Sequence, residues 1–338
     1  MTLPPSLEQH QPTIEAELHA LLDASSGSGL PLYQIMAYQL GWVDKQGTPE
    51  MGMAPVRLYG ALCLEAALLV GQEVPAPVAS AMEMLYNSIQ VHEDMQVGSP
   101  HLENRPAVWW EWGPAQAINV GDGLHALARL GAFRMQSTGA TAEQILKSVS
   151  SLDSTALRFY EGQFLELTFQ ERIDILESQY MKMAEAKYGT LIGGSMALGA
   201  LTNGGDDQTV DALRRAGELI GVAAQLTDDL RQLTSSPGTE GPAARVLNKS
   251  KLFPVVRALE TATLPQKRLL GEVYFKRVME PDDVAKVSKV VDEVGAREYT
   301  EAKAKELRQE ALERMAGVGV SGAALTRWEE IVDYIMGS

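Results

Sequence analysis

Apolar residues recur at spacings of three and four along most of the chain, and this spacing is typical of helices with one buried face. The pattern predicts helices over 16–24, 56–70, 78–94, 117–133, 143–169, 171–201 and 210–233. More polar helices are predicted to follow over 266–315. No run alternates between apolar and polar residues for long enough to indicate a strand. We therefore predict an all-α fold.

Turn-forming residues separate the predicted helices. Clusters rich in glycine, proline, serine and asparagine lie at 25–31, 98–106, 202–207 and 235–242. No composition shift marks a domain boundary, and no fixed-period repeat is visible. We therefore predict a flexible N-terminus over 1–14 and a single all-α domain over 15–338.

Composition narrows the possible functions. The chain has 338 residues, of which 45% are hydrophobic, so it can bury a large core. Its formal net charge of −15 argues against binding to nucleic acid or to anionic membranes. Cys63 is the only cysteine, which excludes an intrachain disulfide and a cysteine-based zinc site. No signal-peptide pattern and no transmembrane segment is found, so we expect a cytoplasmic protein.

Two pairs of adjacent carboxylates are the main candidate chemistry. Glu93-Asp94 ends the predicted helix 78–94, and Asp228-Asp229 lies near the end of 210–233. Carboxylates are unfavourable at the negative end of a helix dipole and costly to bury. One such pair would simply point to solvent, but two suggest a cation between them. Ligands that are all oxygen suit Mg²⁺, which uses one or two carboxylates with water and phosphate oxygens.

Other polar side chains lie on apolar helices. Gln225 precedes Asp228 by about one turn, so the two share a helical face. Lys187 could meet a phosphate, and Gln163 and Glu166 add polar groups to a face that carries phenylalanines. Each has a simpler interpretation as a solvated charge or a hydrogen-bonded core amide, and the residues alone do not decide between the two.

The segment VHEDMQVGSPHLENRPAVWWEWGPAQAINVGDGLHALA (91–128) resembles the first aspartate-rich region of a known family, the trans-isoprenyl diphosphate synthases. Four later segments resemble further motifs, in the family's order: EGQFLEL (161–167), KYGTLIGG (187–194), GVAAQLTDDL (221–230) and NKSKLFPVVRALE (248–260). The resemblance covers about residues 15–320.

The resemblance implies a bundle of long antiparallel helices around a deep apolar cavity, and usually a homodimer. It also implies Mg²⁺ and an allylic prenyl diphosphate, whose ionisation the metal assists. The candidate metal ligands are Glu93, Asp94, Asp228 and Asp229. The candidate catalytic residues are Asp94, Asp228, Gln163 and Gln225. The candidate diphosphate-binding residues are Lys187, Lys251 and Arg105, and the candidate cavity residues are Tyr86, Ser88, Ile89, Phe159 and Tyr188.

The sequence departs from the family pattern where cations are expected. The third aspartate of the first motif falls on Val97, and the paired arginines and the glycine after it fall on Leu102, Glu103 and Asn104. The family's loop lysine has acidic Glu240 as its nearest match, and residues 27–33 offer no cation. Each lost phosphate contact removes about 1.5–3 kcal/mol. Most of the losses belong to the isopentenyl diphosphate site.

Three functions remain open from the sequence. The first is an enzyme that ionises an allylic diphosphate without elongating it, as a terpene-synthase-like cyclase or lyase. The second is a prenyltransferase, either a prenyl diphosphate synthase or one that uses another acceptor. The third is a silent regulatory subunit that forms a heteromer with an active synthase. The missing cations favour the first interpretation over ordinary elongation.

Overall fold

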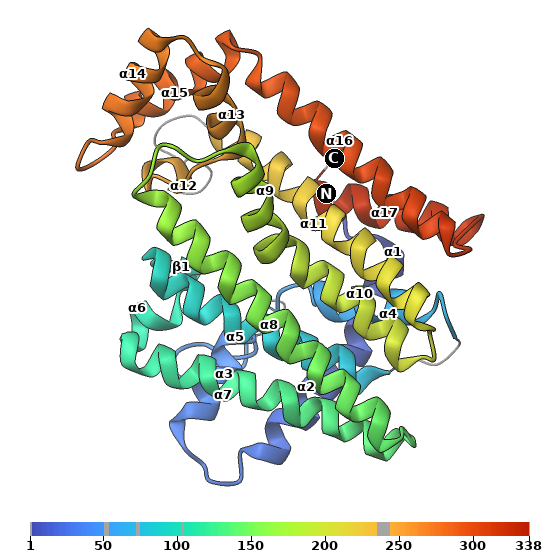
Figure 1. The fold of residues 1–338 in the computed structure, drawn as a ribbon. Coiled ribbons are helices and arrows are strands. Elements are labelled where there is room, and N and C mark those ends of the chain that lie inside the picture. The colour runs from blue at the N-terminus through green and yellow to red at the C-terminus, as the bar shows by residue number, and fades with distance from the viewer. Residues whose placement is uncertain (1, 51–53, 72–74, 103–104, 235–243, 338) are drawn as a thin grey trace. The chain divides into compact units, whose positions relative to one another are not determined.

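The computed structural model describes residues 2–50, 54–71, 75–102, 105–234 and 244–337 (Figure 1). Helices dominate these ranges, and the predicted all-α fold is confirmed. Contacts group the chain into two compact units. We call Thr2–Ala156 with Gly194–Arg214 the N-terminal unit, and Leu157–Gly193 with Arg215–Ser338 the C-terminal unit. The sequence calls on Glu103, Asn104 and Glu240 lie outside the described residues.

The elements follow one another along the chain as a run of helices. The N-terminal unit contains α1 (Pro5–Glu8), α2 (Gln11–Ser25), α3 (Pro31–Gln39), α4 (Leu58–Ala67), α5 (Ala76–Val97), β1 (His101–Leu102), β2 (Arg105–Pro106), α6 (Val108–Trp112), α7 (Pro114–Phe133) and the 3-10 helix η1 (Arg134–Thr138). Residues of both units occur in α8 (Ala142–Gln170), α10 (Thr190–Thr202) and α11 (Asp207–Thr234). The C-terminal unit contains α9 (Glu177–Ala184), the π-helix η2 (Glu185–Gly189), α12 (Ala244–Leu247), α13 (Phe253–Thr261), α14 (Leu264–Tyr274), α15 (Pro281–Glu293), α16 (Ala296–Gly317) and α17 (Ala323–Met336).

In the N-terminal unit, α5 packs against α2, α4 and α7. Both α4 and α5 are apolar over most of their surfaces, which suits helices that are covered on several sides. The segment predicted to be flexible forms α1 and the start of α2. Its Leu7 side chain is fully buried, and His10 lies 2.8 Å from the Glu65 carboxylate.

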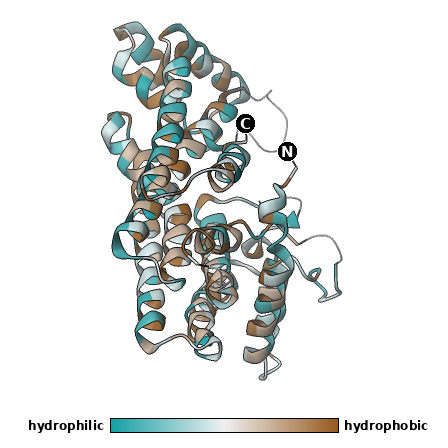
Figure 2. Cartoon of the chain, turned by 90° about the vertical axis from the view of Figure 1, so that its right-hand side faces the viewer, coloured by the Kyte–Doolittle hydropathy of each residue, from teal (hydrophilic) through white to brown (hydrophobic). Residues whose placement is uncertain are grey.

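In the C-terminal unit, α12 to α16 enclose a separate apolar cluster. Its members are mostly valine and leucine, including Leu252, Val255, Leu270, Val287 and Val291. Helices α13, α15 and α17 of this unit carry apolar residues along one side, and Figure 2 shows hydrophobic and hydrophilic residues mixed along the helices of the chain. Burial of the apolar stripes is the main source of the unit's stability. Within the described ranges, every helix falls short of the length and apolar character that crossing a bilayer requires.

Three local features differ from the sequence prediction. Short antiparallel strands β1 and β2 form where none was expected, because two residues per strand are too few to produce an alternating pattern. Helix α5 continues for a turn past Asp94, to Val97, and ends on Gly98 in the left-handed conformation. The helix predicted over 171–201 is divided into α9, η2 and α10.

Candidate active site

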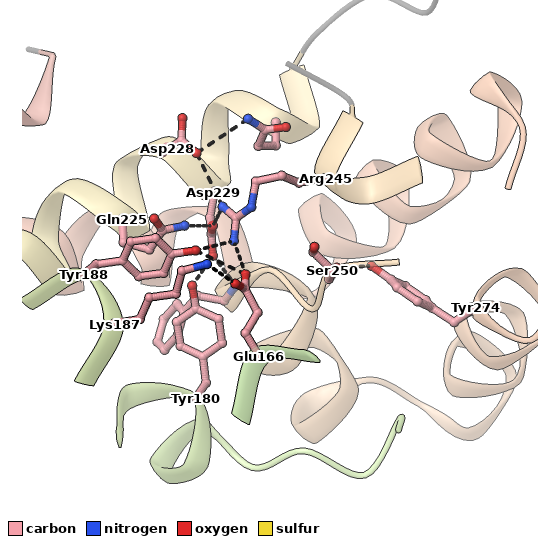
Figure 3. A network of polar contacts seen from close by, with 12 residues as sticks. Glu166, Tyr180, Lys187, Tyr188, Gln225, Asp228, Asp229, Arg245, Ser250 and Tyr274 are labelled. Carbon is pink, nitrogen blue, oxygen red and sulfur yellow. Dashed lines mark hydrogen bonds and ion pairs between the residues drawn. The ribbon is translucent and has the colours of Figure 1, made fainter. Parts of the chain in front are cut away.

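Asp229 of the second acidic pair is fully buried and saturated with hydrogen bonds (Figure 3). Its Oδ1 accepts from Gln225 Nε2 at 2.6 Å and from Arg245 Nη1 at 2.7 Å. Its Oδ2 accepts from the Phe253 backbone N–H at 2.7 Å and from the Tyr180 hydroxyl. Burial raises the pKa of Asp229 above its usual value, although Arg245 opposes this shift. Asp229 therefore organises its neighbours and presents no open oxygen.

Asp228 differs from its neighbour because 42% of its side chain is exposed. Both of its described contacts use Oδ2, which lies 3.4 Å from Arg245 Nη1 and 3.5 Å from Gln232 Nε2. Its Oδ1 has no partner among the residues that the structure describes. Asp228 is therefore the member of this pair that can reach a ligand.

Arg245 on α12 is the central cation of the cluster, and the sequence analysis missed it. Besides the two aspartates, its guanidinium donates to Glu166 Oε1 at 3.0 Å and to the Tyr188 hydroxyl at 3.2 Å. These carboxylates and hydroxyls hold the pKa of Arg245 above its usual value despite burial. The sequence does contain one indication of this role. Arg245 ends the segment TEGPAAR (239–245), where the family has a lysine, and it is the only cation in that segment.

Glu166 is bonded on both oxygens. Its Oε2 accepts from the Lys187 ammonium, and its Oε1 accepts from Arg245 and from the Tyr188 hydroxyl at 3.1 Å. Burial alone would raise the pKa of Glu166, but Lys187 and Arg245 outweigh it and lower the pKa to about 2. The carboxylate is thus ionised at any physiological pH. Gln163 lies buried about one turn before it on α8.

Lys187 occupies the π-helix η2 with its side chain almost fully buried. Its ammonium lies 5.8 Å from the ring centroid of Phe159 and 5.0 Å from that of Tyr188, distances at which a cation and an aromatic ring attract. Phe159 and Tyr188, predicted to line a cavity, therefore surround an ion pair. The predicted role of Lys187 in diphosphate binding stays a prediction.

Two glycines let neighbouring helices touch the backbone of η2. A methyl group added at Gly162 of α8 would lie 2.5 Å from the Lys187 backbone nitrogen, and one at Gly221 of α11 would lie 2.4 Å from the Tyr188 carbonyl oxygen. Real side chains do not approach backbone so closely. These glycines therefore fix how far Lys187 stands from Glu166.

Gly162→Ala is expected to lower the free energy of unfolding by about 1–3 kcal/mol, because η2 must move away from α8. Gly271→Ala is the matched control, since its added methyl group meets only Ile173 at 3.4 Å. It is expected to be neutral or slightly stabilising. Urea unfolding of both variants measures the difference, and equal effects would contradict the role of close packing.

Lys251 lies apart from this cluster in the same unit. Its ammonium donates to the carbonyls of Gln170 and Lys249, both at 3.0 Å, and lies 4.4 Å from the Tyr274 ring centroid. Burial, with help from Lys249, lowers the pKa of Lys251 to about 8. The residue lines a cavity of about 270 Å³ together with Arg172. Its predicted diphosphate contact stays a prediction.

In the N-terminal unit, the first acidic pair lies in the last turns of α5. Asp94 is buried, and its Oδ1 accepts from Gln90 Nε2 at 2.7 Å. Gln90 in turn accepts from the Tyr86 hydroxyl at 3.1 Å. Asp94 Oδ2 is buried and has no hydrogen-bond partner among the described residues. Glu93 is half-buried beside it.

The other predicted residues of this unit have mixed environments. Ser88 and Ile89 are buried on α5, and the cavity that they are predicted to line stays a prediction. Arg105 donates to the backbone carbonyls of Tyr38 and Gln39, where α3 ends. A cation at this position satisfies carbonyls that the helix leaves unpaired. The structure thus gives Arg105 a capping role.

Ionisation of the buried Asp94 carboxyl lowers the stability of the folded chain at neutral pH. Burial raises its pKa from 3.8 to about 7, partly opposed by the Gln90 hydrogen bond. The folded state therefore retains a proton that the unfolded state releases between about pH 4 and pH 7. The contribution of this group is fully favourable below pH 4, and it is lost as the pH rises through 7.

Asp94→Asn is consequently expected to raise the melting temperature at pH 8 in the presence of a metal chelator. The gain is at most about 4 kcal/mol, since the pKa of Asp94 rises from 3.8 to about 7 and each pKa unit is about 1.4 kcal/mol. At pH 4 the difference from the natural chain should nearly vanish. Exposed Asp23→Asn is the control and should change neither value. Equal effects of Asp94→Asn at both pH values would contradict the buried, uncompensated charge.

The carboxylates predicted to bind magnesium differ in how well they suit the ion. Within the described ranges, no three histidine, cysteine, aspartate or glutamate side chains cluster as a metal site. Magnesium needs fewer, because substrate phosphates and water complete its shell. Asp94 and Asp228 each have one carboxylate oxygen without a partner among the described residues, and these two fit. Asp229 does not fit, because four donors occupy its oxygens.

Comparison with known proteins identifies the family. The family model described as polyprenyl synthetase matches residues 56–293, which is more than half of the chain. The chain belongs to the polyprenyl synthetase family. This polyprenyl synthetase homologue is 31% identical over 287 residues to a geranylgeranyl diphosphate synthase of Mycobacterium tuberculosis, covering 83% of this chain and 81% of the relative. It is 27% identical over 309 residues to a (2E,6E)-farnesyl diphosphate synthase of Mycobacterium bovis, covering 89% and 85%.

The solved structures agree on the fold. A polyprenyl synthetase from Streptomyces coelicolor A3(2) is similar with a TM-score of 0.85 and 26% identity, and 98% of each chain is covered. This likeness confirms the predicted isoprenoid synthase fold. Within the family, the synthases named above favour the prenyltransferase alternative over the cyclase or lyase interpretation.

Proposed function

We propose that this chain is a magnesium-dependent prenyltransferase that joins an allylic prenyl diphosphate to isopentenyl diphosphate. The observation that carries the proposal is the pairing of the half-exposed Asp228 carboxylate with the Arg245 guanidinium, 3.4 Å apart. A metal–diphosphate complex needs both an anionic oxygen for the metal and a cation for the phosphate oxygens. Both are present in one cluster, and the named relatives are prenyl diphosphate synthases.

Arg245 is the residue best placed to hold a diphosphate. Its planar guanidinium matches phosphate oxygens in two parallel hydrogen bonds, and 23% of its side chain is exposed. Glu166 accepts a hydrogen bond from Arg245 and so orients the guanidinium, and Lys187 helps to keep the Glu166 carboxylate ionised. Arg245 also weakens the case for a cyclase, because it supplies a cation in the segment where the family's loop lysine is missing.

Asp228 would give a carboxylate oxygen to magnesium, and the predicted metal role of Asp94 stays a prediction. Magnesium held there would supply positive charge that stabilises diphosphate as a leaving group. Tyr180 of α9 and the backbone N–H of Phe253 donate to the neighbouring Asp229 and so anchor α11 at this point. Phe159 and Tyr188 offer ring faces that stabilise a nearby positive charge. The homodimer expected from the resemblance stays a prediction.

The experiment is diphosphate release from C5, C10, C15 and C20 allylic diphosphates with Mg²⁺, with and without isopentenyl diphosphate. The proposal predicts release that requires isopentenyl diphosphate and that Arg245→Gln strongly reduces. Release without isopentenyl diphosphate would instead support the cyclase or lyase function. No release under either condition would overturn the proposal and favour a silent subunit, which a search for an active partner synthase would then test.

A further inference from the structure

The cluster around Arg245 has an unusual balance of charge. Three carboxylates, Glu166, Asp228 and Asp229, surround its single guanidinium. Nη1 faces the two aspartates at 3.4 and 2.7 Å, and Nη2 faces Glu166 at 3.0 Å. Lys187 adds a second positive charge on the far oxygen of Glu166. The guanidinium therefore contacts both aspartates of the second acidic pair.

The contacts of Asp229 leave no open oxygen for a metal at that residue. A magnesium ligand must bring a lone pair to about 2.1 Å from the ion without a donor hydrogen in the way. Oδ1 of Asp229 already accepts from Gln225 and Arg245, and Oδ2 accepts from Tyr180 and Phe253. A metal at Oδ1 would have to displace the guanidinium, and the two positive charges would repel each other.

We propose that Arg245 is a resident counter-ion of the second acidic pair and that it competes with divalent metal for Asp228. In the absence of substrate, the guanidinium offsets part of the negative charge of the pair, and the pair binds metal weakly. A diphosphate, whose oxygens accept from the guanidinium, would draw Arg245 away from Asp228 and open that carboxylate to metal. The proposal rests on the proposed magnesium binding by Asp228, but its test needs no turnover.

The test is a titration of the substrate-free protein with Mn²⁺, followed by electron paramagnetic resonance and by calorimetry. Arg245→Gln removes the charge and is expected to tighten metal binding at least tenfold. The gained binding should disappear when Asp228→Asn is added to Arg245→Gln. Mn²⁺ should also raise the melting temperature of Arg245→Gln more than that of the natural chain, because the metal replaces the lost counter-ion.

Arg257→Gln is the matched control. Arg257 is exposed to a similar extent, lies in the same unit, and pairs with Glu177 and Glu260 instead of the aspartates. This variant should leave metal binding unchanged. Arg245→Lys keeps the positive charge and should stay within about threefold of the natural affinity.

A second comparison decides the case if Arg245→Gln does not fold. Under the proposal, the natural chain and Asp228→Asn bind Mn²⁺ equally in the absence of substrate, because Arg245 already occupies Asp228. A clear loss of Mn²⁺ binding on Asp228→Asn alone would overturn the proposal. Neither result depends on whether the chain transfers prenyl groups, so failure of the proposed function remains distinguishable.

Discussion

Asp228→Asn is expected to reduce turnover at least a hundredfold while changing the melting temperature little. Asparagine keeps the size and one acceptor oxygen of aspartate but loses the negative charge that a metal requires. Removing a group that stabilises developing charge in a transition state typically costs about 10²–10³ in rate. Because 42% of the side chain is exposed, the change in unfolding free energy should stay within about 1 kcal/mol.

The measurement is the rate of diphosphate release at saturating Mg²⁺, with a thermal melt of the same preparation. Asp211→Asn is the control, because Asp211 lies on the same helix, is exposed and pairs only with nearby Arg214 among the described residues. It should leave both values unchanged. If Asp228→Asn kept more than a tenth of the natural rate, Asp228 would not be a metal ligand in the reaction.

Lys187→Met is expected to give the largest loss of stability. Methionine fills most of the lysine volume but leaves Glu166 with Arg245 as its only charged partner in the described cluster. Breaking a buried ion pair from one side typically costs about 3–5 kcal/mol. Chemical denaturation should show this loss, and exposed Lys182→Met should show none.

A double-mutant cycle separates the coupling free energy of the Lys187–Glu166 ion pair from the cost of leaving one charge unpaired. The double variant Lys187→Met with Glu166→Gln removes both charges and should be more stable than Lys187→Met alone. A coupling free energy above about 1 kcal/mol in this double-mutant cycle would support the ion pair. Simple additivity of the two substitutions would contradict it.

The main helices could be predicted from the sequence because their periodicity is local. Helix α8 was expected over 143–169 and is found at Ala142–Gln170, and α11 was expected over 210–233 and is found at Asp207–Thr234. The interruption at η2 could not be predicted, because it depends on Gly162 and Gly221 bringing distant helices against one backbone segment. Strands of two residues carry no periodic signal.

Some features of the site could be predicted from the sequence and others could not, for a similar reason. Motif positions placed Gln225, Lys187 and Tyr188 near one acidic pair, and the structure brings them into one cluster. The motifs could not show that Asp229 is closed and Asp228 open, because that difference depends on donors from α9 and from the start of α13. Arg105 and Lys251 are predicted as cations within the matched motif segments, and the structure uses both to satisfy backbone carbonyls.

Arg245 shows what a motif comparison leaves out. The nearest match to the family's loop lysine is an acid, Glu240, but Arg245 lies five residues later in the sequence. Its guanidinium contacts the second acidic pair. A charge displaced along a loop can therefore preserve a site that looks degenerate in sequence. This is why the prenyltransferase function is proposed although several expected cations are missing.

The most direct test of that function follows isotopically labelled isopentenyl diphosphate into product. The purified chain would be incubated with Mg²⁺, an allylic diphosphate and the label, and the products would be treated with phosphatase and weighed by mass spectrometry. The account predicts a labelled prenyl alcohol that is heavier than the starting one by whole isopentenyl units and that is absent with Asp228→Asn. Unlabelled hydrocarbon or alcohol of unchanged carbon number would contradict it.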